Sequence, residues 1–98
     1  MIKKKIPCYS EVPVVLSVKE RDLVRDETFC DPEFGRVGVV EGDKIKLMMT
    51  LDDIEDVLGH IASVTNNTKD KKLEKELDKI YDKLQKVMDG YEEVEDMD

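Results

Sequence analysis

Apolar residues recur every three or four positions over two stretches in the second half of the chain, and this spacing predicts two amphipathic helices. We expect the helices at 51–65 and 69–89. Thr50 and Thr68 precede the two stretches, and a threonine hydroxyl at such a place accepts a hydrogen bond from a free backbone N–H of the first turn. Because only a few polar residues separate the stretches, the helices should fold back on each other as a long C-terminal antiparallel helical hairpin.

Strand-like patterns fill most of the first half. Residues 1–16 are expected to form an extended arm, since the two prolines in it lack the N–H that an interior strand donates. The pattern leaves open whether this arm joins the following strands or exchanges with a neighbouring chain. A serine and a glutamate three residues apart, Ser17 and Glu20, then match the capping box that begins a helix, which we expect at 18–28.

A β-hairpin is predicted at 36–49, where Gly42 and Asp43 form a two-residue loop of the glycine-first type. Polar and apolar residues alternate after this loop, so one face of the hairpin should be solvated and the other buried. The expected fold class is α+β, with a small antiparallel β-hairpin or sheet, a short N-terminal helix and the long helical hairpin. We expect these elements to form one domain over 1–90.

Charge is unevenly distributed along the chain. The 98 residues include 16 Lys or Arg and 24 Asp or Glu, and residues 51–98 supply the whole net charge of -8. Part of this excess lies in 91–98, which we expect to be a disordered acidic tail. An acidic protein is poorly suited to coating nucleic-acid phosphates, so we expect no nucleic-acid partner. No apolar run reaches the length of a membrane span, so we expect no membrane partner. The basic start lacks a following apolar segment, so we expect a cytoplasmic protein.

The stretch from Thr68 to Asp78, Thr-Lys-Asp-Lys-Lys-Leu-Glu-Lys-Glu-Leu-Asp, resembles the charge-rich helices of a group of small bacterial proteins of no assigned function. The resemblance covers the second half of the chain. It implies a charge-rich C-terminal helix, and it carries no activity, cofactor or site residue.

The second predicted helix has the apolar spacing of a helix that pairs with another. Its apolar positions step by four and three residues, as in a coiled coil, but over fewer than three heptads. Packing within the chain explains this pattern, and contact with a second chain is the alternative. Because this helix is about a turn and a half longer than the first, its last apolar residues extend beyond the end of the first helix and lack a packing partner there. The candidate interface consists of Tyr81, Leu84, Val87, Met88 and Tyr91.

His60 is the only histidine, the residue type that most often serves as a base in enzymes. Asp56 precedes it by one helical turn and Asp53 lies on the same side of the helix, so the three residues form a candidate polar cluster. An ion pair on the surface of one helix is the simpler interpretation, and a metal-dependent hydrolase centred on His60 and Asp56 is the functional one. Cys8 and Cys30 add no zinc-ligand spacing, so we assign no metal, cofactor or catalytic residue.

The leading hypothesis is a non-enzymatic interaction or accessory protein that uses its helical hairpin to contact a protein partner, most simply a second copy in a homodimer. The alternative is a regulatory decoy whose acidic surface occupies the nucleic-acid-binding site of a partner protein. That surface comprises Asp52, Asp53, Glu55, Asp56 and the tail. Lysines on one flank of the second helix, Lys79, Lys83 and Lys86, are expected to face the acids of the first helix and fix the register of the hairpin.

Overall fold

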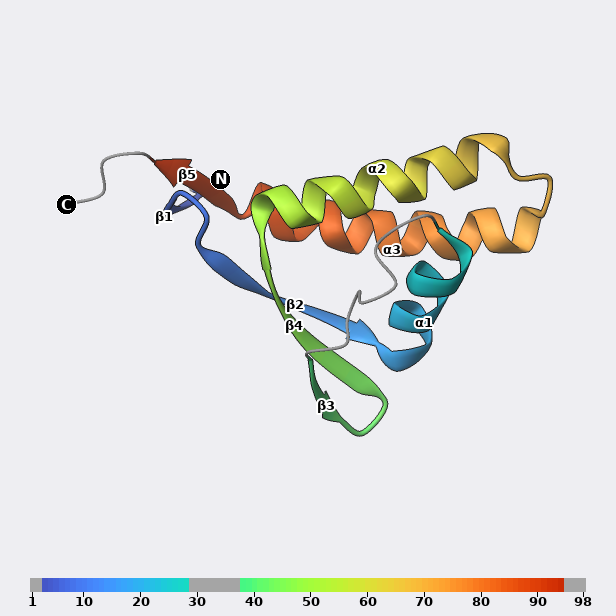
Figure 1. Cartoon of the computed structure of the whole chain (residues 1–98), viewed down its shortest axis with the longest axis horizontal. Helices are drawn as coiled ribbons and strands as arrows, with labels where there is room; N and C mark the ends of the chain where they lie inside the picture. Colours follow the sequence, from blue (N-terminus) through green and yellow to red (C-terminus); the bar gives the residue numbers. More distant parts are fainter. Residues whose placement is uncertain (1–2, 29–37, 95–98) are drawn as a thin grey trace.

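A three-stranded antiparallel sheet lies against a pair of long helices in the computed structural model, which describes residues 3–28 and 38–94 (Figure 1). The strand order is β2–β4–β3, with β2 at Glu11–Ser17, β4 at Lys44–Thr50 and β3 at Val39–Glu41. The part of the extended arm that forms β2 therefore joins the hairpin strands of its own chain, because β2 pairs with β4 along its whole length. β2 is an edge strand, as its proline requires.

β3 and β4 form the predicted hairpin around the two-residue loop that Gly42 begins. Gly42 has a φ of 65°, a left-handed conformation that glycine adopts at no steric cost. Gly38 precedes β3 and lies against the buried side of the sheet, where an added Cβ would come within 2.6 Å of Ile45 and 2.7 Å of Leu47. Glycine thus allows a close approach of the backbone. Residues 36–37 of the predicted hairpin lie outside the described residues.

Each of the three helices in the described part of the chain begins after a residue whose side chain accepts a hydrogen bond from the first turn. α1 spans Val18–Glu27, α2 spans Leu51–Asn67 and α3 spans Lys71–Asp89. Ser17 and Glu20 form the predicted capping box of α1, in which each side chain accepts a hydrogen bond from the other residue's backbone N–H. These reciprocal bonds satisfy donors that the start of a helix otherwise leaves free.

The start of α3 differs from the prediction by two residues. Asp70, not Thr68, is the N-cap, and its Oδ1 accepts hydrogen bonds of 3.1 Å from the N–H groups of Lys72 and Leu73. Thr68 instead caps the end of α2, and its hydroxyl oxygen accepts a hydrogen bond from the Asp70 N–H. A carboxylate at the cap satisfies two donors here and also carries the negative charge that the helix dipole favours.

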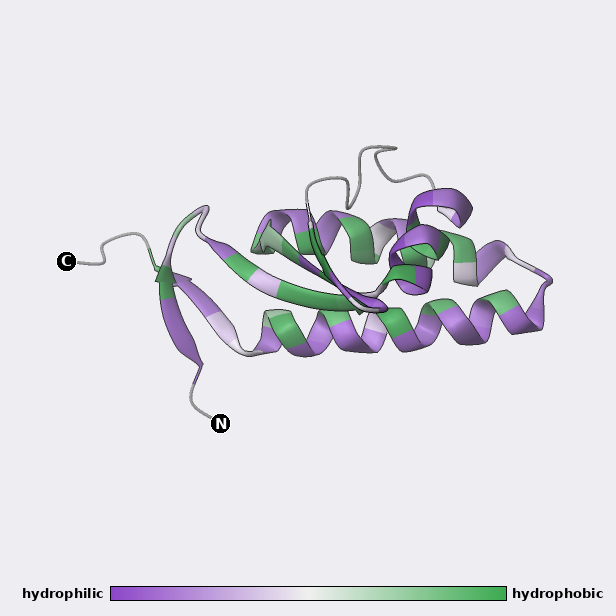
Figure 2. Cartoon of the chain, turned by 90° about the horizontal axis from the view of Figure 1, so that it is seen from below, coloured by the Kyte–Doolittle hydropathy of each residue, from purple (hydrophilic) through white to green (hydrophobic). Residues whose placement is uncertain are grey.

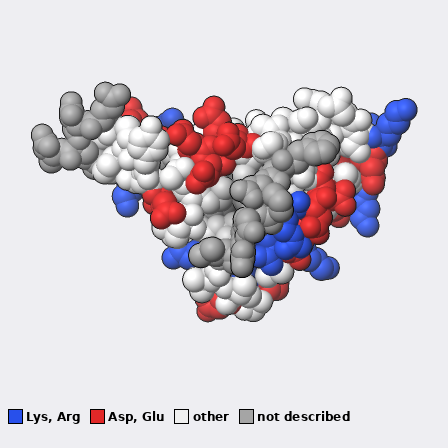
Figure 3. Space-filling model, in the orientation of Figure 1, with Lys and Arg blue, Asp and Glu red and all other residues white. Residues whose placement is uncertain are grey.

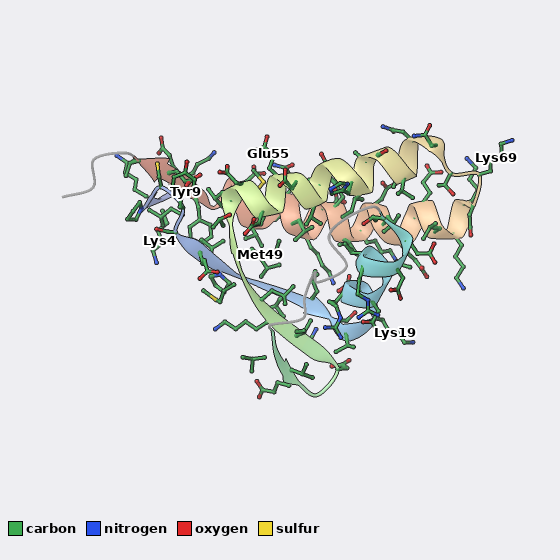
Figure 4. All side chains as sticks on the ribbon, viewed as in Figure 1. Lys4, Tyr9, Lys19, Met49, Glu55 and Lys69 are labelled. Carbon is green, nitrogen blue, oxygen red and sulfur yellow. The ribbon has the colours of Figure 1, made fainter. Side chains whose placement is uncertain are left out.

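α2 and α3 run antiparallel and are joined by a short loop, and the sheet covers one face of the pair (Figures 1 and 2). Only every second side chain of β2 and β4 is buried, so these strands meet the apolar stripes of α2 and α3 in one core. Met49, labelled in Figure 4, belongs to this core. The largest fully buried side chains are those of Leu16, Ile45, Ile54, Ile61, Leu77, Ile80 and Leu84. α1 packs against β2, β4 and α3.

The two ends of the described chain pair with each other, which corrects part of the predicted tail. β1 at Lys4–Pro7 and β5 at Tyr91–Val94 form a parallel two-stranded sheet at one end of the molecule (Figure 1). A lysine of β1 lies opposite a glutamate of β5, so the basic start attracts the acidic segment after α3. The prediction of a disordered tail over 91–98 is wrong for 91–94, and 95–98 lie outside the described residues.

The chain is therefore α+β, with three helices and two small sheets in the part that the structure describes. The finer placement differs from the expectation at both ends. Two strands precede α1, and β5 follows the helical pair, because both chain ends return to pair with each other. In residues 3–28 and 38–94, none of the helices combines the length and the apolar character that crossing a membrane requires.

Candidate interaction surfaces

The five residues predicted as an interface do not share one surface. Leu84 has no exposed surface and packs in the core, so another molecule cannot touch it. Tyr81 and Met88 line a groove between α2 and α3, whereas Val87 and Tyr91 line a separate hollow beside β1 and β2. These four side chains are half-buried against the core. The apolar spacing placed all five on one side of α3, but the neighbouring elements divide that side.

The groove between α2 and α3, hereafter the α2–α3 groove, has a volume of about 360 Å³. It is lined by Glu55, Leu58, Gly59 and Ala62 from α2 and by Tyr81, Gln85 and Met88 from α3. A Cβ added at Gly59 would meet no atom within 4 Å, so the space above this glycine is open. Glycine inside a helix costs about 1 kcal/mol relative to alanine. No close contact in the described chain requires that glycine.

Acidic side chains surround the α2–α3 groove. Glu55 lies at its rim and points away from the sheet in Figure 4, and Asp89 accepts a hydrogen bond of 3.0 Å from Nε2 of Gln85. Asp52 and Asp78 lie on the same two flanks by helical spacing, and both are exposed. We call Asp52, Glu55, Asp78 and Asp89 the rim acids. Figure 3 shows acidic side chains gathered over the first half of α2.

The candidate polar cluster of Asp53, Asp56 and His60 lies on α2, where Asp53 has a structural role. Asp53 completes the capping box of α2, where its carboxylate accepts a hydrogen bond from the N-cap backbone N–H. Within the described part of the chain, no three His, Cys, Asp or Glu side chains are grouped so that they could hold a metal ion. Cys8 is exposed, and Cys30 lies outside the described residues. The hypothesis of a metal-dependent hydrolase thus gains no grouped ligand set.

The lysine flank of α3 faces α1. Lys79 and Lys83 line a groove of about 540 Å³ between α1 and α3, with Lys19 and Leu23 on the α1 side. Nζ of Lys83 donates to both carboxylate oxygens of Glu20, at 2.7 Å each. The expected pairing of Lys83 with the acids of α2 is therefore wrong, because α1 occupies the side of α3 on which Lys83 lies.

The Glu20 carboxylate ties the start of α1 to α3. Burial raises the pKa of Glu20, but hydrogen bonds from Lys83 and from the backbone N–H of Ser17 outweigh it, so the pKa lies below its ordinary value. Glu20 is mostly buried, with 19% of its side chain exposed, whereas 51% of the Lys83 side chain is exposed. The pair therefore has a structural role at the edge of the core.

The sheet face turned away from the helices carries exposed apolar side chains. Val15, Val39 and Met48 have exposed fractions of 52%, 69% and 49%. Val15 and Val39 both lie opposite Lys46 in the strand register, and Pro13 lies opposite Met48, so these side chains share one face. We call it the outer sheet face. The candidate residues chosen from the sequence include none of these apolar side chains.

A sequence signal for the outer sheet face does exist. A strand with one buried face alternates apolar and polar residues, but Val14–Val15–Leu16 and Leu47–Met48–Met49 are unbroken apolar runs. Since successive strand residues point to opposite faces, the middle residue of each run must point outward when its neighbours are buried. The two runs therefore mark Val15 and Met48 as exposed apolar positions.

Comparison with protein-family models, curated proteins and solved structures gives no match to this chain. A function is therefore inferred from the surfaces of the molecule. The α2–α3 groove combines an open hollow with one sign of charge, and the outer sheet face combines apolar side chains with charges at its ends.

Proposed function

We propose that the protein is a non-enzymatic interaction protein whose α2–α3 groove binds a basic amphipathic helix of a partner protein. The observation that carries the proposal is an apolar hollow with an acidic rim on one face of the helical pair. A partner helix of this kind lays its apolar stripe into such a groove and keeps its charged residues at the rim.

The lining of the groove suits an apolar anchor from a partner. Gly59 and Ala62 leave open space between the helices, into which one side chain of a partner fits. Tyr81 and Met88 are half-buried, so part of each side chain remains available for contact. Tyrosine is frequent at the centre of interfaces, and methionine adapts its shape to different partners.

The rim acids determine which charge a partner carries. They attract lysine and arginine side chains and increase the rate of association with a basic segment. The same charges oppose a second copy on this face, since acids would face acids. The homodimer expected through Tyr81, Leu84, Val87, Met88 and Tyr91 therefore has less support at this groove than a basic partner.

Two synthetic helical peptides test the proposal. Both have the same length and the same leucine stripe, and one carries lysines on its polar face where the other carries glutamates. In titrations of the ¹⁵N-labelled full chain, we expect the basic peptide to shift the amide signals of Gly59, Ala62 and Gln85, with an affinity that falls as salt is added. Equal binding of both peptides, or shifts confined to the sheet, would contradict the proposal.

Matched substitutions locate the contact within α2. Gly59→Leu fills the hollow and should weaken binding of the basic peptide about tenfold or more. Asn67→Leu adds the same side chain to an exposed position at the last residue of α2, outside the groove, and should leave the affinity within about twofold. Circular dichroism checks that both variants fold. An unchanged affinity in Gly59→Leu would remove the groove from the proposal.

The decoy hypothesis requires the acidic side chains of α2 but does not require the α2–α3 groove. Asp52, Glu55 and Asp56 are exposed along the start of α2, which favours a flat acidic contact as the second candidate. A decoy depends on total charge, so Glu55→Lys and Asp56→Lys would weaken binding of the basic peptide equally and Gly59→Leu would not. The groove predicts a larger loss for Glu55→Lys, since Glu55 lines the groove and Asp56 does not.

A further inference from the structure

We infer that the outer sheet face is a self-association surface, which pairs with the same face of a second copy of the chain. Three large apolar side chains, Val15, Val39 and Met48, are about half exposed or more on this small face. Apolar side chains gathered in one exposed patch mark a contact surface. Figure 2 shows β2 and β4 in front of α2 and α3, with no described segment covering them. No strand residue lines the α2–α3 groove, so the two surfaces are separate.

The strand register arranges the outer sheet face in four rows. From one end to the other, the rows read Ser17–Lys44–Glu41, Val15–Lys46–Val39, Pro13–Met48 and Glu11–Thr50. The two middle rows are apolar apart from Lys46, whose stem can lie along its neighbours while its ammonium group reaches solvent. At one end of the face Lys44 lies opposite Glu41 of the same copy, and at the other end Glu11 is the charged residue.

Charge decides between the two face-to-face arrangements that have two-fold symmetry. With the axis parallel to the strands, each row meets the same row of the second copy, and lysines face lysines. With the axis across the strands, the rows of the second copy run in the reverse order. Val15 of one copy then meets Pro13 and Met48 of the other, and Glu11 approaches Lys44 of the other. The geometry therefore favours the axis across the strands, as in aligned packing of two sheets.

The size of the face sets the strength of the contact. Four rows of a three-stranded sheet cover an area on the order of 300 Å² per copy, from the usual strand rise and spacing. Stable dimers bury about 800 Å² per copy, so we expect a weak, reversible dimer that forms at about 100 μM and above. Both α2–α3 grooves stay accessible in this dimer because they use other elements.

Sedimentation equilibrium of the full chain tests the inference. Between about 10 μM and about 1 mM, the weight-average mass should rise from 11.3 kDa toward twice that value. A chain that stays monomeric at the highest concentration overturns the inference. A dimer that forms equally in Val39→Thr and Val40→Thr overturns the assignment to this face.

Val39 and Val40 are matched neighbours in β3. Both are exposed, but Val39 lies on the outer sheet face, whereas Val40 lies opposite buried Ile45 on the other face. Because a symmetric dimer contains each substitution twice, Val39→Thr should weaken association about tenfold and Val40→Thr less than about twofold. Threonine keeps the β-branched shape, so both variants should retain the fold.

A charge exchange tests the two-fold arrangement. Glu11→Lys and Lys44→Glu alone each place like charges together and should weaken the dimer several-fold, and the two changes together should restore it. No recovery in the double variant overturns the axis across the strands. Gly59→Leu should leave self-association unchanged, so a failed groove proposal and a failed dimer are distinguishable.

Discussion

Two glycine-to-alanine substitutions should change stability in opposite directions, because Gly59 and Gly38 occupy opposite environments. Gly59 lies inside the 17-residue helix α2, and a Cβ there meets no atom within 4 Å. Gly59→Ala therefore gains helix propensity without a steric cost. At Gly38, a Cβ comes within 2.6 Å of Ile45 and 2.7 Å of Leu47, whose side chains are fixed in the core.

The magnitudes follow from these surroundings. Gly59→Ala should raise the free energy of unfolding by about 1 kcal/mol, the usual difference between alanine and glycine in a helix. For a chain of this length, that increase corresponds to a rise in Tm of about 4–8 °C. Gly38→Ala forces the core side chains off their rotamers and should lower the free energy of unfolding by about 1–3 kcal/mol, the usual cost of overpacking.

Thermal and urea unfolding followed by circular dichroism measure both variants beside the wild-type chain. An unchanged or lower Tm in Gly59→Ala would mean that the space above Gly59 is occupied or that α2 does not extend through it. A Gly38→Ala variant as stable as the wild type would mean that the backbone does not approach the buried side of β4. Either result would refute the reasoning for that glycine.

Three other predictions test the register, one ion pair and the paired chain ends. Met49→Ala should cost about 2–5 kcal/mol and Met48→Ala under about 0.5 kcal/mol in urea unfolding, since Met49 is buried and Met48 exposed; equal costs would place β4 in another register. Glu20→Gln should lower stability by under about 1 kcal/mol at pH 7. Burial raises the pKa of Glu20, but the hydrogen bonds from Lys83 and from the Ser17 backbone N–H lower it by more. The stability difference between the wild type and Glu20→Gln therefore holds above the ordinary value of 4.5 and disappears as the pH falls through the lowered pKa. A stability difference that persists in acid would contradict the pairing of Glu20 with Lys83. Deletion of residues 91–98 should speed hydrogen exchange in β1 and lower the Tm, whereas a disordered tail predicts no change.

The starts of α1 and α2 could be read from the sequence because capping is local. Ser17 with Glu20 satisfies backbone donors three residues apart, and the structure has both of the hydrogen bonds that this spacing predicts. The turn at Gly42 is equally local, since one positive φ suffices to reverse the strand. The alternation in β2 and β4 also fixed which side chains are buried, and its interruption at Val15 and Met48 marks the outer sheet face.

Long-range pairing decided the rest of the fold and of the candidate surfaces. The sequence of Tyr91–Val94 is typical of a disordered acidic tail, but in the structure this segment pairs with Lys4–Pro7 as a strand. The two segments are separated by most of the chain, so no local pattern predicts the pairing. The sequence predicts that Lys83 faces the acids of α2, but Lys83 pairs with Glu20 of α1. Helical spacing gives the side of α3 on which Lys83 lies, but it does not give the element that packs against that side. The sequence by itself determined the three helices, the capping boxes of α1 and α2, and the buried faces of β2 and β4, since backbone hydrogen bonding and periodicity act within a few residues. Only the tertiary structure decided which faces meet, because that depends on the packing of all elements around one core.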